Sequence, residues 1–475
     1  MDRMQTFTRQ ELDMLHNASM EILGRTGMDF NHEKTARLFN SHGIKTEGTK
    51  VFLTEKQVLA ALDTVPSKFK IHARNPEKSV DVGEDSFIFM PTGGAPNVAE
   101  PDGSQRPATL ADFINCCKLV HTSDQLDMGG YIMVQPNDIP AETSHLDMIS
   151  NYFLFCDKPV FGGSATVTAA LDTIEMAGLF FGGKEALKQK PVMNAVANVA
   201  SPLQFSEEQT EVIVAMAEYN QPTILTNMIL AGASGSISLP SLLALQNAEI
   251  LAGIVLSQLV SPGAPVVFGS TSAPMDMKTM TSAVGASETL KIANATTQLA
   301  RYYKLPSRCG GGLTDAHLPD GQAFAESALM LSTVVRNGVN VVYHSCGQMG
   351  SFISMSFEKW MIDEEICKTV RELICPIDLS PDSFDTDLIH DIGIGGQYLT
   401  HPKTFDQFKQ LSQPILFNRK DYSKWLSSNG KAVHECASQK VADRLDAYER
   451  PYIDSGIEKA LLEFVAMRKK ELLSN

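Results

Sequence analysis

Residues 265–271 read Pro-Val-Val-Phe-Gly-Ser-Thr, a short apolar run that ends in small polar residues. Such a run is typical of a strand that is buried on both faces and ends in a turn. Residues 287–303 follow with apolar side chains at helical spacing. A buried strand followed by a helix is the repeating unit of a parallel α/β sheet, so this stretch predicts an α/β fold.

The same pattern occurs eight times along the chain. The apolar runs are Phe87–Met90, Leu126–Met128, Pro159–Phe161, Val192–Val199, Thr223–Leu225, Pro265–Phe268, Ser307–Gly312 and Asn340–Tyr343. Eight strand–helix units over roughly 260 residues match a (β/α)8 TIM barrel, which takes about 250 residues. We therefore expect the barrel over 86–375. An α/β extension over 1–85 precedes it, and a C-terminal helical region over 376–475 is expected to pack on it.

Composition and charge narrow the partners. The 475 residues include 40 basic and 55 acidic side chains, which gives a net charge of −15. We expect no nucleic acid and no anionic membrane surface as partner, since both need a basic surface. The sequence also shows no secretory signal and no apolar run of about 18 residues. The eight cysteines lack Cys-x-x-Cys spacing, so we expect reduced thiols in a cytoplasmic protein.

The strand end at residues 341–348, Val-Val-Tyr-His-Ser-Cys-Gly-Gln, holds the most chemically active side chains. Alternate residues of a strand share a face, so His344 and Cys346 are expected to point the same way. Cys309 lies at the matching level of the preceding strand. These three residues could form a catalytic zinc site with an open position. Alternatively, both cysteines are small buried hydrophobic residues and His344 bonds a ligand or the backbone.

Several longer motifs occur in a fixed order along almost the whole chain. They are Gly93–Pro96, Asp102–Asp112, Gln246–Gly253, Ala264–Gly269, Arg308–Gly312 with Asp315, Tyr343–Gly347, Glu358-Lys359 with Asp363, and Gly395–His401. In this combination the chain resembles the trimethylamine methyltransferase family of corrinoid-dependent methyltransferases. The resemblance implies a (β/α)8 barrel that moves a methyl group from an amine to a Co(I) corrinoid (cob(I)alamin), which a separate small protein carries.

The chain departs from the trimethylamine enzymes at one important position. Those enzymes carry pyrrolysine at the end of a late barrel strand, where this sequence has the standard residues Tyr343–Cys346, with His344 as the nearest match. The chain is thus similar to the members without pyrrolysine, which implies a small quaternary amine as methyl donor. Glycine betaine is the first choice, before proline betaine, carnitine and choline. A quaternary ammonium leaves as a neutral amine without a general acid, so orientation and desolvation are the remaining tasks.

The expected site binds both ends of a betaine, and we assign no catalytic residue. His344 and Arg308 are the candidate donors to the carboxylate. The other candidate substrate-binding residues are Tyr343, Phe357, Phe268, Asn198 and Asn227. No tightly bound metal is expected, and the partners are a cognate corrinoid protein and the amine. Self-association fits a barrel of this size. Two alternatives stay open: a zinc-dependent thiol methyltransferase that uses Cys309, His344 and Cys346, and a non-catalytic betaine-binding barrel.

Overall fold

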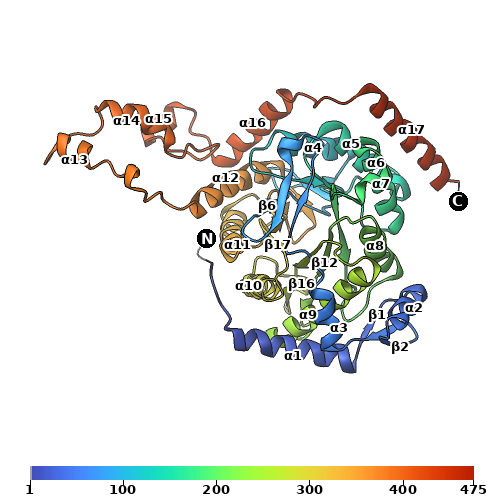
Figure 1. The fold of residues 1–475 in the computed structure, drawn as a ribbon. Helices are drawn as coiled ribbons and strands as arrows, with labels where there is room; N and C mark the ends of the chain where they lie inside the picture. Colours follow the sequence, from blue (N-terminus) through green and yellow to red (C-terminus); the bar gives the residue numbers. More distant parts are fainter. Residues whose placement is uncertain (1–2, 475) are drawn as a thin grey trace.

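Eight parallel strands form one sheet that curls around the centre of the molecule (Figure 1). The computed structural model describes residues 3–474. The strands are β6 (Ile88–Phe89), β9 (Gly129–Gly130), β10 (Val160–Phe161), β11 (Met193–Asn198), β12 (Thr223–Asn227), β14 (Val266–Ser270), β17 (Ser307–Gly310) and β18 (Val341–Tyr343). From β9 to β18 each of these strands pairs in parallel with the next one along the chain, and β18 pairs in parallel with β6. The seam between β6 and β9 is bridged where the backbone N–H of Asp127 donates to the Phe89 carbonyl at 3.0 Å.

Eight helices surround these strands, one after each (Figure 1). They are α4 (Leu110–Thr122), α5 (Ser144–Phe155), α6 (Val167–Phe181), α8 (Glu207–Glu218), α9 (Leu239–Val260), α10 (Ser287–Tyr302), α11 (Gly321–Asn337) and α12 (Phe357–Ile374). Side-chain caps start several of them, for example Thr109 at α4 and Asp320 at α11. The expected (β/α)8 barrel is confirmed.

One predicted strand is shifted along the chain. The second strand is Gly129–Gly130 and not the apolar run Leu126–Met128 that precedes it. Gly130 has a φ of +141°, and a Cβ there would collide with the backbone of Phe161 on β10. The sequence pattern predicted that these glycines form a turn, but in the structure they form the strand itself. Only glycine permits such a close approach of two backbones.

The N-terminal residues pack beside the barrel, next to α9. They form α1 (Arg9–Arg25), β1 (Met28–Asp29), α2 (Glu33–Ser41), β2 (Lys45–Glu47), β3 (Lys50–Phe52), α3 (Glu55–Leu62), β4 (Lys68–Ile71) and β5 (Val80–Gly83). Helices α1 and α3 both contact α9. Helix α9 is long and apolar enough to cross a membrane by composition alone, but 78% of its apolar window is buried inside the molecule. It is therefore apolar all round because other helices cover it.

Short strands lie in the loops that follow the barrel strands. One small sheet combines β7 (Asn97–Ala99), β8 (Gln105–Pro107), β19 (Gln348–Met349) and β20 (Ser354–Met355). Another combines β13 (Leu230–Ala231), β15 (Ala273–Asp276) and β16 (Thr281–Ser282). These strands follow β6, β12, β14 and β18, so they lie around the carboxyl ends of the barrel strands, where they order the loops that carry site residues.

The C-terminal region has two parts with different surroundings. Helix α16 (Val433–Asp446) contacts α12 and α4, and α17 (Ser455–Leu472) contacts α5 and α6. Residues 376–432, which we call the arm, instead extend away from the barrel (Figure 1). The arm contains α13 (Thr386–Ile392), α14 (Pro402–Gln407) and α15 (Tyr422–Ser427). We expected the whole region 376–475 to pack on the barrel, but this description holds only for α16 and α17, because no residue of the arm is buried.

A buried ion pair connects α12 to the ends of two barrel strands. Lys359 and Asp363 are fully buried, and Lys359 Nζ donates to Asp363 Oδ2 at 2.6 Å. Lys359 Nζ also donates to the Gly312 carbonyl after β17, at 2.9 Å. Asp363 Oδ2 accepts from the backbone N–H of Gly347 after β18, at 2.8 Å. The pair therefore holds the loop after β17 and the loop after β18 against α12.

Removing one partner of this pair should destabilise the fold strongly. Lys359→Met leaves Asp363 as an unpaired buried carboxylate, and we expect a loss of about 3–5 kcal/mol in the free energy of unfolding, measured by urea denaturation. Lys459→Met is the matched control, since Lys459 and Glu463 form an exposed pair with the same helical spacing. The control should change stability by less than about 1 kcal/mol. Equal losses for the two variants would contradict this account.

Candidate functional site

A cavity of about 310 Å³ lies where the barrel strands end. Its lining includes Gly93, Tyr131, Phe161, Asn198, Thr226, Thr271, Arg308, Tyr343, His344 and Phe352. These residues lie in, or in the loops that follow, all eight barrel strands, and barrel enzymes place their chemistry at this end of the strands. The cavity reaches the molecular surface, because its lining includes the exposed Ala165 and Met228. A small molecule can therefore enter from this end.

Arg308, on β17, is the charged group of the cavity. Only 3% of it is exposed, and the described residues include no carboxylate within ion-pair distance of it. Its Nη1 lies 3.4 Å from Thr226 Oγ1 and 3.3 Å from Thr271 Oγ1, and its Nε has no hydrogen-bond partner. Burial lowers the pKa of Arg308 to about 10, so the guanidinium still carries its charge at neutral pH. A buried cation without an anion is costly, and an anionic ligand would offset that cost.

His344 follows β18 and is locked in one tautomer by Arg308. Its Nε2 lies 3.2 Å from Arg308 Nη2. A guanidinium only donates, so Nε2 accepts and Nδ1 carries the hydrogen. Nδ1 has no acceptor among the described residues. Burial first, and the charge of Arg308 second, hold the pKa of His344 well below its usual value, so the imidazole is neutral. The pair therefore presents a fixed cation and a neutral donor with unmet hydrogen-bonding capacity.

Aromatic rings form the rest of the wall. The ring of Tyr343 stacks on His344 with centroids 4.0 Å apart, and Phe161 lies 5.3 Å from Tyr343. Phe352 meets the ring of His344 edge-on, with centroids 5.1 Å apart. Tyr131 completes the set, and burial raises its pKa to about 12, so its phenol stays neutral. Aromatic faces next to a polar corner suit an organic cation that also carries a polar group.

Close packing on one side of the cavity requires glycine. A Cβ on Gly93 would collide with the Tyr343 hydroxyl and approach His344. The backbone N–H of Gly93 donates to Gln348 Oε1 at 3.3 Å, and Thr92 Oγ1 donates to the same oxygen at 2.8 Å. Gln348 thus joins the loop after β6 to the loop after β18. This link fixes the positions of Tyr343 and His344 in the wall.

The structure brings together four of the seven residues proposed for substrate binding. His344, Arg308, Tyr343 and Asn198 line the cavity. Asn227, Phe268 and Phe357 do not, and the reason differs for each of the three.

Asn227, the last residue of β12, is buried against α9, where its Nδ2 donates to Glu249 Oε2 at 2.8 Å. Phe268 is turned outward by the alternation of β14 and packs toward Tyr303. Phe357 begins α12 and packs on the core outside the cavity. None of these three side chains reaches the cavity lining in this structure.

Sequence reasoning missed Tyr131, Phe161, Phe352, Thr226 and Thr271. Phe161 could have been found, since it ends the third predicted strand. Thr226 directly follows one predicted run and Thr271 lies three residues beyond another, so both carried the same signal. Phe352 had none, because it lies in a loop nine residues beyond the end of β18 and has a φ of +78°. Only the folded loop places it against His344.

The proposed zinc residues do not converge. Cys309 Sγ faces α10, where it lies 3.8 Å from the Ala293 carbonyl, and Cys346 Sγ lies 4.0 Å from Cys367 of α12. His344 has a φ of +58°, which breaks the strand alternation that predicted a common face with Cys346. The cavity lining contains no Cys, Asp or Glu. The zinc hypothesis for Cys309, His344 and Cys346 is therefore wrong on geometry.

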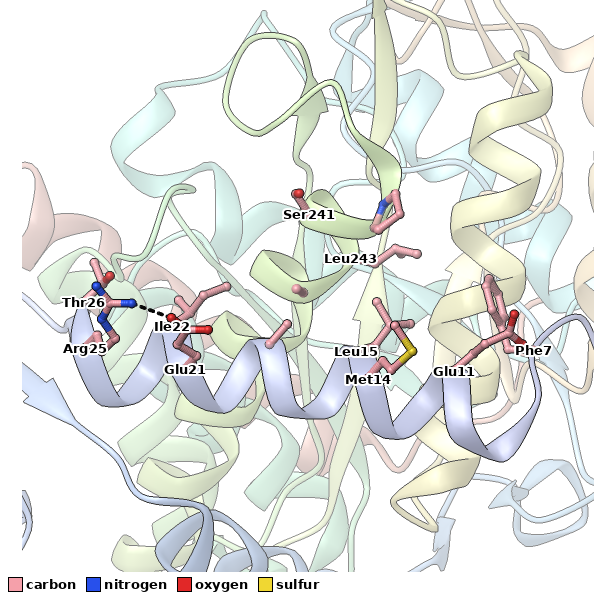
Figure 2. Close-up of a pocket in the computed structure, with 13 residues that line it drawn as sticks. Phe7, Glu11, Met14, Leu15, Glu21, Ile22, Arg25, Thr26, Ser241 and Leu243 are labelled. Carbon is pink, nitrogen blue, oxygen red and sulfur yellow. Dashed lines mark hydrogen bonds and ion pairs between the residues drawn. The ribbon is translucent and has the colours of Figure 1, made fainter.

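A larger groove on the outside of the barrel has a different character. It lies between α1 and the start of α9, and Figure 2 shows Met14, Leu15, Ile22 and Leu243 along it. Its charged groups are at the margins, where Glu21 and Arg25 pair with each other. No unpaired titratable side chain of its lining points to the centre of the groove. The smaller cavity at the strand ends is therefore the candidate active site.

Comparison with known proteins agrees with this fold. The profile of the family described as trimethylamine methyltransferase (MTTB) matches residues 1–473. The chain belongs to this family. A glycine betaine methyltransferase of Desulfitobacterium hafniense (strain Y51) is 37% identical over 466 residues, which cover 98% of this chain and 97% of the relative. The family resemblance seen in the motifs is confirmed, and with it the expected class of enzyme, a methyltransferase.

Other relatives are less similar to this chain. A trimethylamine methyltransferase of D. hafniense (strain DSM 10664 / DCB-2) is 28% identical, covering 98% of this chain and 94% of the relative. An L-carnitine:corrinoid methyltransferase of Eubacterium limosum is also 28% identical, covering 96% and 95%. Among solved structures, the monomethylamine methyltransferase of Methanosarcina barkeri aligns with a TM-score of 0.53 at 13% identity, over 93% of this chain and 89% of that one. This last similarity supports the fold alone.

The tautomer and charge of His344 can be tested directly. Because burial lowers its pKa, the ring should gain a proton only at a pH well below about 6.5, the ordinary value. In protein labelled with ¹⁵N-histidine, we expect the His344 signal to keep a neutral Nδ1–H pattern throughout the range from about pH 8 to 6. His344→Gln identifies the signal by its loss. An imidazolium pattern for His344 at neutral pH would contradict the assignment.

Proposed function

We propose that this protein transfers a methyl group from a zwitterionic quaternary amine, with glycine betaine as first choice, to the Co(I) corrinoid of a partner protein. The observation that carries the proposal is Arg308, a buried guanidinium that lines the cavity without a carboxylate partner in the described chain. A betaine carboxylate would supply the missing anion through charge-assisted hydrogen bonds. The unpaired Nδ1–H of His344 is a second donor beside it.

The other end of a betaine fits the aromatic wall. Phe161, Phe352 and Tyr131 line the cavity together with the Tyr343 ring, which also lies 5.0 Å from the Arg308 guanidinium. Aromatic faces attract quaternary ammonium groups. A cation without a carboxylate, such as choline, would meet the charge of Arg308 with nothing to screen it. Electrostatics therefore favours a zwitterion over a simple cation.

The similarities to known enzymes support the same substrate class. The relative that is 37% identical is named a glycine betaine methyltransferase, and more distant relatives are named for L-carnitine and proline betaine. All three donors contain a quaternary nitrogen and a carboxylate. We place glycine betaine first because that relative combines the higher identity with nearly full coverage of both chains.

The reaction needs little acid–base chemistry from this chain. The methyl carbon bonds to the Co(I) acceptor as its C–N bond breaks, and the electron pair of that bond stays on nitrogen. The product amine, dimethylglycine from glycine betaine, is neutral at nitrogen when it leaves. The protein's residues anchor the carboxylate, hold the ammonium among aromatic rings and exclude water from the methyl group. This division of labour agrees with a cavity that lacks a carboxylate or thiol to act as catalytic acid.

The corrinoid enters this proposal as a substrate that a partner protein carries. The cavity opens to the surface at the strand ends, so a methyl group held inside could meet an acceptor docked there. We infer no resident metal in the cavity, because its lining offers one imidazole and no thiol or carboxylate ligand. We place the protein in the cytoplasm, where its free cysteines would stay reduced. Because the partner carries the corrinoid, the purified protein should be colourless.

The proposed reaction can be measured with reduced cobalamin, or with a reduced corrinoid protein, and a panel of amines. We expect loss of the Co(I) absorbance with glycine betaine and little change with choline. A betaine-binding barrel without catalytic activity would leave the spectrum unchanged while still binding betaine in calorimetry. Trimethylamine as the preferred donor, or no reaction with any betaine, would overturn the proposal.

Arg308→Met tests the carboxylate contact. The variant removes a charged hydrogen bond worth about 1.5–3 kcal/mol, so kcat/KM for glycine betaine should fall about tenfold or more. Arg301→Met is the control, because Arg301 is half-buried and, like Arg308, has no ion pair in the described chain, but it lies at the carboxyl end of α10, outside the cavity lining. It should leave kcat/KM unchanged. Equal effects of the two variants would remove Arg308 from the site.

His344→Ala should act in the same direction. Loss of the second donor should lower kcat/KM for glycine betaine about tenfold, while any residual reaction with choline should change less. The comparison between the two substrates separates a contact to the carboxylate from general disruption of the wall. Unaltered betaine kinetics would show that His344 only supports Tyr343 and Arg308.

A further inference from the structure

The arm, residues 376–432, exposes an unusual amount of apolar surface. None of its residues is buried, including those of α13, α14 and α15. Thirteen of the 29 large apolar side chains that are exposed on the described chain lie in these 57 residues. They are Ile377, Leu379, Phe384, Ile389, Ile394, Tyr398, Leu399, Phe405, Phe408, Leu411, Ile415, Tyr422 and Leu426. Surface of this kind on a projecting segment marks an interaction site.

The arm cannot hide these side chains by itself. It runs outward and returns, and the two halves are joined by an ion pair between Lys403 and Asp385 (Figure 1). Its contacts with the barrel are limited, chiefly the backbone N–H groups of Leu416 and Phe417 that bond to Glu365 of α12. Ordering so many residues is costly in conformational entropy, and burial of apolar surface against another molecule would offset that cost.

The charges of the arm are separated between its two halves. Residues 376–400 carry five aspartates and no lysine or arginine, a net charge of −5. Residues 401–432 carry six basic and two acidic side chains, a net charge of +4. When two copies of the arm lie antiparallel across a two-fold axis, the acidic half of each faces the basic half of the other. The arm is therefore complementary in charge to a second copy of itself.

The position of the arm separates it from the candidate active site. The arm leaves the barrel after Ile374, the last residue of α12, whereas the cavity lies where the barrel strands end. In this fold the helices run back against the strands, so the carboxyl ends of helices and strands are at opposite ends of the barrel. A partner that docks over the cavity would thus leave the base of the arm free for a different contact.

We propose that the arm is a self-association element that pairs with the arm of a second copy of this chain in an antiparallel, two-fold symmetric contact. The exposed apolar side chains form the centre of the contact, and the acidic and basic halves set its direction. A stable interface engages about 20–30 residues on each side, and the arm supplies 57, so its length is sufficient. The rest of each chain has a net charge of −14, so the two barrels of a dimer would repel each other. A contact through the projecting arms keeps the two barrels apart.

Light scattering coupled to size-exclusion chromatography tests the contact on the full-length protein. We expect a mass of twice 51.8 kDa at micromolar concentration. The double variant Ile394→Asp/Phe405→Asp changes two of the most exposed apolar side chains of the arm and should elute as a monomer. Leu329→Asp/Met467→Asp is the matched control, because both side chains are exposed but lie on α11 and α17. The control should remain a dimer.

Charge reversal tests the direction of pairing. One variant carries Lys409→Glu, Lys420→Glu and Lys424→Glu, which makes both halves of its arm acidic. The other carries Asp382→Lys, Asp387→Lys and Asp391→Lys, which makes both halves basic. Each alone should be monomeric because like charges then face each other. An equal mixture should form a dimer that contains one copy of each.

Two results would overturn the proposal: a monomeric wild-type protein, or a dimer that survives both the apolar and the charge-reversal variants. Failure of the mixture to pair would overturn the antiparallel direction. The outcome is independent of the proposed reaction, because none of these substitutions touches the cavity. Methyl transfer from glycine betaine, measured per subunit, should be the same in the monomeric variants as in the wild type.

Discussion

Parallel pairing of eight strands is the constraint on which the rest of this molecule depends. Seven pairs of neighbouring strands form parallel ladders, and the hydrogen bond between Asp127 and Phe89 bridges the seam, so all eight carboxyl ends meet at one rim. That geometry gathers side chains from positions as distant as Phe161 and His344 around one cavity. The buried pair of Lys359 and Asp363 then fixes the loops after the last two strands.

Within that rim, the electrostatics of Arg308 govern what the cavity can accept. Its guanidinium is only 3% exposed and has no carboxylate partner in the described chain, so the free protein contains an uncompensated buried positive charge. It also sets the tautomer of His344 and lies over the ring of Tyr343. One charge thus organises a donor, a neutral imidazole and an aromatic wall. A zwitterionic amine satisfies all three, whereas an amine without a carboxylate leaves the charge unmatched.

The family relationship and the geometry contribute different parts of the functional argument. Family membership gives methyl transfer, and the similarity to a glycine betaine enzyme gives a named first substrate. Neither explains why a carboxylate would be needed, which follows from Arg308. The arm belongs to neither argument. Its apolar surface and divided charge concern the assembly of the protein, at the end of the barrel away from the chemistry.

The sequence by itself determined the barrel, because buried parallel strands must be short, apolar and followed by helices, and seven of the eight runs lie where strands formed. It also predicted His344, Arg308, Tyr343 and Asn198, which the structure places in the cavity lining. Only tertiary structure decided the rest. The positive φ of His344 separated it from Cys346, strand alternation turned Phe268 outward, and a folded loop brought Phe352 to the cavity. Likewise, the arm contains helices, as do the segments before and after it. Whether such helices pack on the barrel or stay exposed depends on tertiary contacts, which the local sequence does not encode.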